Sequence, residues 1–425
     1  MGMLRRTMAA CALVFALTIG LTGSPAWAID QATLISRLQT YSAKMGPSSG
    51  AYVVDLTAGV ELFARNADMR LTPASNEKLF TTATALTNFT PRGRLQTTVR
   101  AGGGSTVDGA GVLHGDLYLI GGGDPSLNDV ALHSLVSQLR DTTHITRITG
   151  GVVGDESIFD TKRGSRASDF HTDPNLGGWL GGLTWSHGRA SPGGPAAVAA
   201  ARLQSFLKAD GITSGRKARR GRLAADTNGG ASPTLATVSS PPMSTLIATT
   251  NQPSDNFYAE TLLKDLGARF GGAGTTAAGL AIVRKTLGAY GLKPTIADGS
   301  GLSTVDRTTP REIVQLLRSM AAGPLGTTFK ASLAQPGLTG TLATRMRGTS
   351  APGRCQAKTG TLHSVSALSG YCLSKGGHQM VFSFLENNIA PLTVKKIEDK
   401  MVPAIASYTP VASAGAQPAR SVSHR

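Results

Sequence analysis

Three short strings in the sequence carry residue types that together could perform acyl transfer. They are Ser75-Asn76-Glu77-Lys78, Ser254-Asp255-Asn256 and Lys358-Thr359-Gly360. A serine hydroxyl becomes a nucleophile when a nearby base removes its proton, and a neutral lysine amine can be that base. Each string alone occurs often by chance, whereas the three in this order supply a nucleophile, a base, a proton relay and a carboxylate anchor. They predict a serine acyl-transfer site.

The first string places a serine and a lysine on one face of a helix start. A helix that begins at Ser75 puts the hydroxyl at the positive end of the helix dipole, and Lys78 lies three residues on, on the same face. A lysine that is buried, or that lies near another cation such as Lys358, reaches neutrality near pH 7. The alternative is an N-capping serine followed by a surface lysine, which the other two strings disfavour. We expect Ser75 to be the nucleophile and Lys78 its base.

The second and third strings would handle the leaving group and the substrate. We expect Ser254 to relay a proton to the leaving amine, and Asn256 to hold a substrate carbonyl or to orient Lys78. Lys358, on a strand edge, can bind a substrate carboxylate together with Thr359. The alternative for the second string is a polar turn that caps the following helix.

Backbone groups complete the expected site. The N–H groups of Ser75 and Thr361 would stabilise the oxyanion that forms when the serine attacks a carbonyl group. Gly360 is expected to let the substrate backbone approach closely. Asp255 lies between two site residues and is expected to point away from the site.

Apolar periodicity predicts the elements that hold the three strings. Residues 75–86 and 257–266 have helical spacing, and residues 365–373 have the composition of a strand that follows the third string. Thr309 is the expected N-cap of a helix that opens at Pro310. Further strands are expected at 50–56, 60–64 and 379–385, and further helices at 243–251, 277–289 and 392–406.

The texture of the sequence changes between residues 92 and 238. Glycine clusters such as Gly121-Gly122-Gly123 separate short β-like segments there. We expect a largely β domain inserted at 92–238 into an α/β domain made of residues 29–91 and 239–411. Residues 412–425, rich in serine, alanine and arginine, are expected to form a disordered basic tail.

Residues 1–28 have the pattern of a secretory signal peptide. Arg5 and Arg6 precede a mostly apolar run, and Ala26-Trp27-Ala28 provides a small-x-small cleavage pattern. The apolar run is too short for a secure membrane span. The adjacent arginines leave twin-arginine export open as an alternative. We expect an exported protein, periplasmic or otherwise extracytoplasmic, at the cell wall or peripheral to the membrane.

The chain is strongly basic, with a formal net charge of +16. A basic exported protein meets anionic surfaces, so anionic wall polymers and the membrane surface are candidate partners, whereas nucleic acid is not. A dense basic cluster at 216–222 could hold such groups, although charge runs are usually solvated loops. The eight histidines are scattered without an H-E-x-x-H pairing, so neither a metal nor another cofactor is expected.

Two cysteines flank the third string once Cys11 has left with the signal peptide. If residues 355–373 form a hairpin in which Thr361 faces Ser366, then Cys355 faces Cys372 across neighbouring strands. Two outcomes are open: a disulfide, which an oxidising compartment favours, or two reduced core cysteines.

With these strings the chain resembles the D-alanyl-D-alanine carboxypeptidase/endopeptidase family, the type-4 low-molecular-mass penicillin-binding proteins of peptidase family S13. The resemblance runs from about residue 50 to about residue 386, and strings at 121–125, 154–160 and 298–303 add to it. It implies an α/β (α+β) fold: a β-lactamase/transpeptidase-like serine acyl-transferase domain split by an insertion after the first string's helix.

The resemblance also implies an activity. Members remove terminal D-alanine from peptidoglycan stem peptides, or cut D,D cross-links, through an acyl-serine intermediate that β-lactam antibiotics trap as covalent inhibitors. It places Asp155 facing the cleft, where it would meet a substrate amine; a turn aspartate is the alternative. Many members carry a further domain nested in the insertion, and the 179 positions from Ser75 to Ser254 hardly accommodate one.

Two other functions compete with this reading. A β-lactamase shares the acylation machinery, and class A enzymes deacylate with a glutamate between the second and third strings. After Glu260 the next glutamate is Glu312, which opens a different helix, and the large insert is unlike a compact lactamase. A catalytically degenerate wall-binding protein is the other alternative, and the intact motif residues disfavour it.

Overall fold

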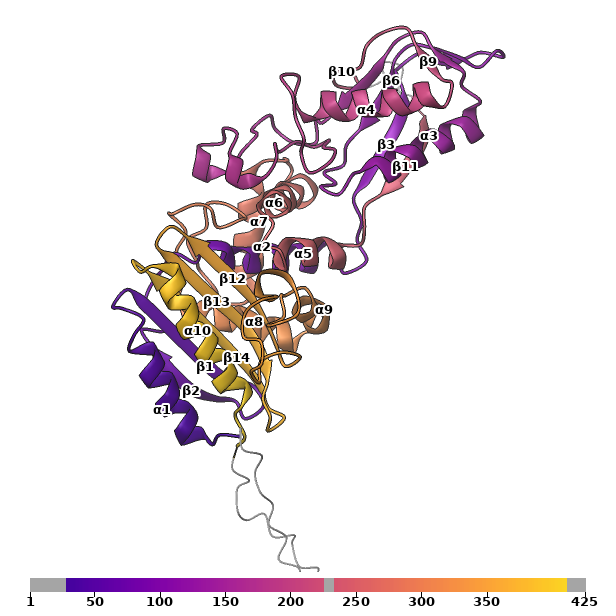
Figure 1. Cartoon of the computed structure of the whole chain (residues 1–425). Helices are drawn as coiled ribbons and strands as arrows, with labels where there is room; N and C mark the ends of the chain where they lie inside the picture. Colours follow the sequence, from indigo (N-terminus) through magenta and orange to yellow (C-terminus); the bar gives the residue numbers. More distant parts are fainter. Residues whose placement is uncertain (1–27, 225–232, 411–425) are drawn as a thin grey trace, which may run out of the picture.

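The computed structural model describes residues 28–224 and 233–410, which form two parts (Figure 1). The signal-peptide prediction, apart from residue 28, and the prediction of a disordered tail lie outside the described residues. Within the described ranges, no helix is long and apolar enough to cross a membrane.

The first part is built on an antiparallel sheet of five described strands in the order β12-β13-β14-β1-β2. Its central strands are buried on both faces, because helices cover both sides. Alternate side chains of a strand pack into the hydrophobic cores on opposite faces of the sheet. Val54 of β1 lies in one core and Val53 in the other. The strands are β1 (Ser49–Asp55), β2 (Val60–Arg65), β12 (Cys355–Leu362), β13 (Val365–Leu373) and β14 (Gln379–Asn387).

Two layers of helices enclose this sheet. The terminal helices α1 (Gln31–Ser42) and α10 (Pro391–Ala406) pack together on one face. The opposite face meets α8 (Pro310–Ala322), which begins at the expected N-cap Thr309 with a capping box. The other helices of this layer are α2 (Lys78–Phe89), α5 (Met243–Asn251), α6 (Asn256–Phe270), α7 (Thr276–Ala289) and α9 (Gly326–Ala331).

The second part is an insert between α2 and α5 with a core of its own. One sheet has the order β10-β8-β6-β3-β11 and a smaller one the order β4-β5-β7-β9, with α3 (Asp129–Thr143) and α4 (Pro195–Ala209) packed against each other. Figure 1 shows α6 and α7 lying between the insert and the first part's sheet. The strands are β3 (Gln96–Ala101), β4 (Thr106–Val107), β5 (Val112–His114), β6 (Leu117–Ile120), β7 (Arg147–Ile148), β8 (Val152–Asp155), β9 (Thr213–Ser214), β10 (Arg219–Arg220) and β11 (Thr234–Ser239).

The predicted fold class, an α/β domain split by an insert, is confirmed, and the insert contains helices as well as strands. The hairpin β12–β13 has the predicted register: Thr361 faces Ser366 and Cys355 faces Cys372. The two sulfur atoms are bonded, which confirms the disulfide over the reduced alternative.

Removing this disulfide should lower stability without changing the fold. The bond closes a loop with a sequence separation of 17. A loop of this size restricts the unfolded chain enough to stabilise the fold by about 3 kcal/mol. We expect the free energy of unfolding of the double variant Cys355→Ala/Cys372→Ala, measured with a chemical denaturant, to be lower by this amount. A reductant should lower the free energy of unfolding of the wild-type chain only. Equal unfolding midpoints and slopes for the two chains would contradict this expectation.

Candidate active site

The nucleophile candidate lies on a strained turn at the start of α2. Ser75 belongs to a 3₁₀ turn, Ala74–Glu77, that runs directly into the helix. Ala74, immediately before it, has a φ of +48°, a left-handed conformation that costs free energy for a residue with a side chain. Lys78, the first residue of α2, is fully buried, and its Nζ lies 3.0 Å from Ser75 Oγ.

Two further contacts orient the Lys78 amine. Its Nζ lies 2.6 Å from Asn256 Oδ1 and 2.6 Å from the Ser300 carbonyl oxygen. Both oxygens can only accept, so each takes one N–H of the amine. The remaining tetrahedral position of the nitrogen faces Ser75 Oγ. In the neutral amine that position is a lone pair, so the geometry fits a base for the Ser75 proton.

Burial favours the neutral form of this amine. It lowers the pKa of Lys78 to about 8, against the opposing effect of the Asp298 and Glu260 carboxyl groups. Lys358 is also fully buried, and its pKa lies well below the ordinary lysine value because of burial and then the Lys78 charge. An appreciable fraction of Lys78 is therefore neutral near pH 7.

Four buried carboxyl groups lie around Lys78, and the charges of Asp298 and Glu260 raise its pKa against the larger effect of burial. Burial raises the pKa of Glu260 to about 8 and that of Asp306 to about 9. Raised pKa values of this kind reduce the negative charge that the two groups carry beside the amine near pH 7. Burial raises the pKa of the other two members as well; the full cluster is Glu77, Glu260, Asp298 and Asp306.

The loop that presents the Ser300 carbonyl is held by this same cluster. Glu260 Oε1 accepts from the N–H groups of Gly299 and Ser300, at 3.0 and 2.9 Å. Asp298 Oδ1 accepts from Ser300 and Gly301. Sequence reasoning missed these contacts, because Ser300 acts through a backbone oxygen. The string at 298–303, noted only for its family likeness, was the available signal.

The second and third strings meet through Lys358. Its Nζ donates to Ser254 Oγ at 2.8 Å and to the Thr359 carbonyl at 2.8 Å. Ser254 has a φ of +65°, a second strained position in the site. Because Ser254 Oγ accepts from Lys358, its own hydroxyl proton is free to point elsewhere. Lys358 is thus placed to orient the expected relay as well as to attract a carboxylate.

The open edge of β12 presents backbone donors. Ala357 exchanges both backbone hydrogen bonds with Ala334, on the side away from β13. Backbone direction repeats every two residues along a strand, so the N–H groups of Thr359 and Thr361 face the same open side. Thr361 is exposed there. This direction suits the expected oxyanion donor at Thr361.

Gly360 has a different reason to be glycine from the one expected. A Cβ built on it would lie 2.7 Å from the Pro73 carbonyl oxygen and 3.1 Å from Ala74 Cβ. The missing side chain therefore lets β12 approach the turn that carries Ser75, rather than making room for substrate backbone.

Helix α6 positions the rest of the second string. Asn256 Nδ2 donates to the Asn175 carbonyl of the insert at 2.8 Å, which leaves Oδ1 turned to Lys78. This contact matches the expected orienting role. Asp255 caps α6 by accepting from the Tyr258 N–H at 2.9 Å, so it points away from the site, as expected.

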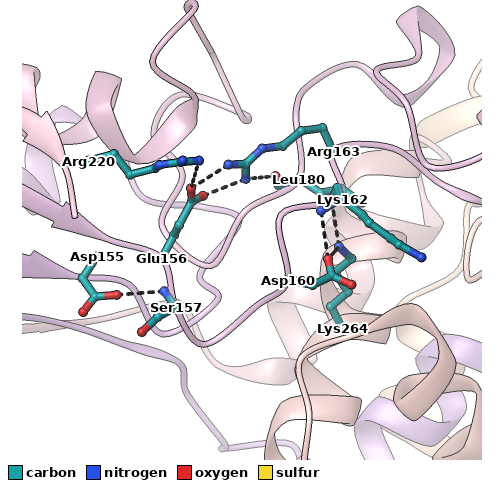
Figure 2. A network of polar contacts seen from close by, with 9 residues as sticks. All are labelled: Asp155, Glu156, Ser157, Asp160, Lys162, Arg163, Leu180, Arg220 and Lys264. Atoms are coloured by element: carbon teal, nitrogen blue, oxygen red, sulfur yellow. Dashed lines mark hydrogen bonds and ion pairs between the residues drawn. The ribbon is translucent and has the colours of Figure 1, made fainter. Parts of the chain in front are cut away.

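The structure does not bring Asp155 to these residues. It ends β8 and is buried in the insert, where Oδ1 accepts from the Ser157 N–H at 2.8 Å (Figure 2). Its Oδ2 accepts from the Leu223 N–H, also at 2.8 Å. Both carboxylate oxygens are thus occupied by backbone donors. These contacts favour the turn aspartate that the sequence left open as the alternative. In the described ranges, no group of three or more His, Cys, Asp or Glu residues is arranged to hold a metal ion.

Adding a side chain at position 360 should disturb the site more than adding one at a glycine with open space around it. Gly360→Ala must push β12 away from the Pro73 carbonyl oxygen, which lies 2.7 Å from the added Cβ, at a cost of about 1–3 kcal/mol in stability. We expect the Gly360→Ala variant to unfold at a lower denaturant concentration than the wild-type chain. We also expect its Ser75 to react more slowly with a serine-reactive probe. Gly288→Ala is the matched control, because nothing lies within 4 Å of its added Cβ. Equal behaviour of the two variants would show that the close approach at Gly360 is unimportant.

Comparisons with known proteins identify relatives of this chain. The chain is 29% identical over 447 residues to a D-alanyl-D-alanine carboxypeptidase from Actinomadura sp. (strain R39), covering 85% of this chain and 82% of that protein. It is 25% identical over 367 residues to a carboxypeptidase from Mycobacterium tuberculosis, covering 80% and 76%.

A solved structure shares the fold. Penicillin-binding protein 4 from Haemophilus influenzae superposes with a TM-score of 0.73 at 18% identity, over 86% of this chain and 97% of that one. The family model described as the D-Ala-D-Ala carboxypeptidase 3 (S13) family matches residues 31–173 and 188–408, which include all three strings. The chain therefore belongs to the D-Ala-D-Ala carboxypeptidase 3 (S13) family.

Proposed function

We propose that this protein is a serine-type D-Ala-D-Ala carboxypeptidase that acts on peptidoglycan stem peptides through an acyl-serine intermediate. The observation that carries the proposal is the orientation of the buried Lys78 amine, whose free position faces Ser75 Oγ. Family membership and the printed activity of the Actinomadura relative support the choice of substrate. Cutting of D,D cross-links would use the same groups.

The reaction begins when neutral Lys78 takes the Ser75 proton and Oγ attacks the carbonyl carbon between the two D-alanines. The N–H groups of Ser75 and Thr361 hold the oxyanion. The proton taken up by Lys78 then reaches the leaving amine through the Ser254 hydroxyl as the C–N bond breaks, so Ser254 is left protonated and D-alanine departs. Water hydrolyses the acyl-serine ester and restores Ser75.

Substrate contacts follow from the open edge of β12. The terminal carboxylate of the peptide meets the Thr359 hydroxyl and Lys358, whose charged form the nearby carboxylate favours. A β-lactam carbonyl is attacked by Ser75 in the same way, which makes such antibiotics covalent inhibitors.

We further propose an extracytoplasmic location, with contact to anionic wall polymers or a membrane surface. Support comes from the exposed basic cluster at 216–222. Arg219 pairs with Asp116 and Arg220 approaches Glu156, so the remaining cations of the cluster would provide most of the attraction.

Loss of the nucleophile tests the proposed activity. Ser75→Ala should reduce D-alanine release from a wall pentapeptide by at least about 10⁴-fold, because no other group in the site replaces the attacking oxygen. Fluorescent penicillin should no longer label the chain. Ser134→Ala, on the exposed surface of α3, serves as the control. Incubation with a defined cross-linked muropeptide beside the pentapeptide measures both activities, and undiminished release by the Ser75 variant would refute the mechanism.

A further inference from the structure

One stretch of the insert contacts the second string but lies outside the family match. The family model stops at residue 173 and resumes at residue 188. Between these positions, the Asn175 carbonyl accepts from Asn256 Nδ2, the contact that turns the Asn256 amide oxygen to Lys78. Residues 174–187, which we name the brace segment, therefore help to orient the base of the reaction.

His187 ties the brace segment to helix α6. Its Nε2 lies 2.8 Å from Asp255 Oδ2, and its Nδ1 lies 3.1 Å from the Gly177 carbonyl oxygen. The ring also packs on Phe257, with centroids 4.6 Å apart. Gly177 follows the short 3₁₀ turn that contains Asn175. One imidazole thus joins the turn that holds Asn256 to the residue that caps α6.

Both partners of the ring can only accept hydrogen bonds. The Gly177 carbonyl requires a proton on Nδ1, and the Asp255 carboxylate requires a proton on Nε2. The contacts therefore suit the imidazolium form. The hydrogen bond that Nε2–H donates to Asp255, and then the charge of that carboxylate, raise the pKa of His187 above its ordinary value, against burial of the ring.

The backbone around His187 is held in a costly conformation. Ser186, His187 and Gly188 all have left-handed φ values, of +48°, +58° and +66°. A Cβ on Gly188 would lie 2.5 Å from Phe257 Cε2, so the chain approaches α6 closely here. Strained positions of this kind persist only where surrounding contacts over-determine them. Here the side-chain contacts of His187 act together with backbone hydrogen bonds, among them Ser186 N–H to the Leu127 carbonyl and Trp179 N–H to the Gly188 carbonyl.

The insert contacts α6 at a second point, so the contact at His187 is part of a wider interface between the insert and this helix. Lys264 of α6 is fully buried and donates to Asp160 Oδ1 at 2.6 Å and to the Lys162 carbonyl at 2.9 Å (Figure 2). The Asp160 N–H donates to the Gly274 carbonyl, just beyond α6. The middle of the helix is therefore anchored, and His187 acts on its first turn.

We propose that His187 is a positioning residue for acylation of Ser75: as an imidazolium it braces Asp255 against the brace segment and so keeps Asn256 aligned with Lys78. The proposal rests on the function proposed above. The titratable and charged groups around the ring are Asp255 and Tyr258 from α6 and, lining the same cavity of about 590 Å³, Asp173 and Arg189.

The two titrations act in opposite directions. The brace is complete below the ordinary histidine pKa of about 6.5 and is lost as pH rises through the raised value. Lys78 becomes an active base only as pH rises towards its pKa of about 8. The advantage of the wild-type chain over a variant without the imidazole should therefore be greatest at acidic pH.

The test measures the second-order rate constant for acylation by fluorescent penicillin between pH 5.5 and 9.5 on the whole exported chain. We expect His187→Ala to be slower by at least about tenfold at pH 6, since small misplacement of a reacting group has effects of this size. The wild-type to variant ratio should shrink towards one at alkaline pH. His114→Ala is the matched control, because His114 pairs with Asp108 at 2.8 Å in the insert, on β5, away from α6.

A second variant and a baseline make the outcome decisive. Asp255→Asn keeps the cap on the Tyr258 N–H through its amide oxygen but removes the charge. Its pH profile should follow Lys78 alone, at a lower pKa, because the Asp255 charge raises the pKa of Lys78 in the wild-type chain. An unchanged rate constant in His187→Ala, or a wild-type to variant ratio that is the same at every pH, would overturn the proposal. Ser75→Ala gives the background rate of labelling by fluorescent penicillin. If the wild-type chain reacts no faster than this variant, the proposed function itself is refuted.

Discussion

The site depends on one interaction: a buried lysine amine is held by two hydrogen-bond acceptors and faces the Ser75 hydroxyl, which can donate to the neutral amine. Lys78 Nζ meets oxygens of Ser75, Asn256 and Ser300, which come from three distant parts of the chain. Burial disfavours the charged amine, and two fixed acceptors leave its third direction for the serine. The surrounding fold has to deliver these oxygens and keep bulk water out, so most of the local architecture follows from this requirement.

Other contacts position each of the three residues around the Lys78 amine. Glycine at position 360 lets β12 lie against the turn of Ser75. Glu260, whose pKa burial raises to about 8, holds the Ser300 loop by accepting from its backbone N–H. The insert contributes as well, since the Asn175 carbonyl fixes the amide of Asn256. The insert, which lies between α2 and α5 in the chain, therefore helps to position a residue of the active site.

Features with a local cause could be predicted from the sequence. The register of Cys355 with Cys372 follows from the two-residue period of a hairpin, and the three strings identify the residues that cluster around Ser75. Contacts through backbone atoms could not be predicted, because a carbonyl such as that of Ser300 has no signature of its own. Asp155 shows the same limit: one of its two partners is the N–H of Leu223, far along the chain.

The most direct test is the pKa of Lys78 in the free protein, measured by NMR titration of the lysine side chains with ¹³C at Cε. The resonance that disappears in Lys78→Met identifies the residue. A pKa of about 8 is the expected result, because burial outweighs the neighbouring carboxyl groups. A value near the ordinary lysine pKa of about 10.4 would mean that the amine stays charged at neutral pH, and it would contradict the role of Lys78 as the base.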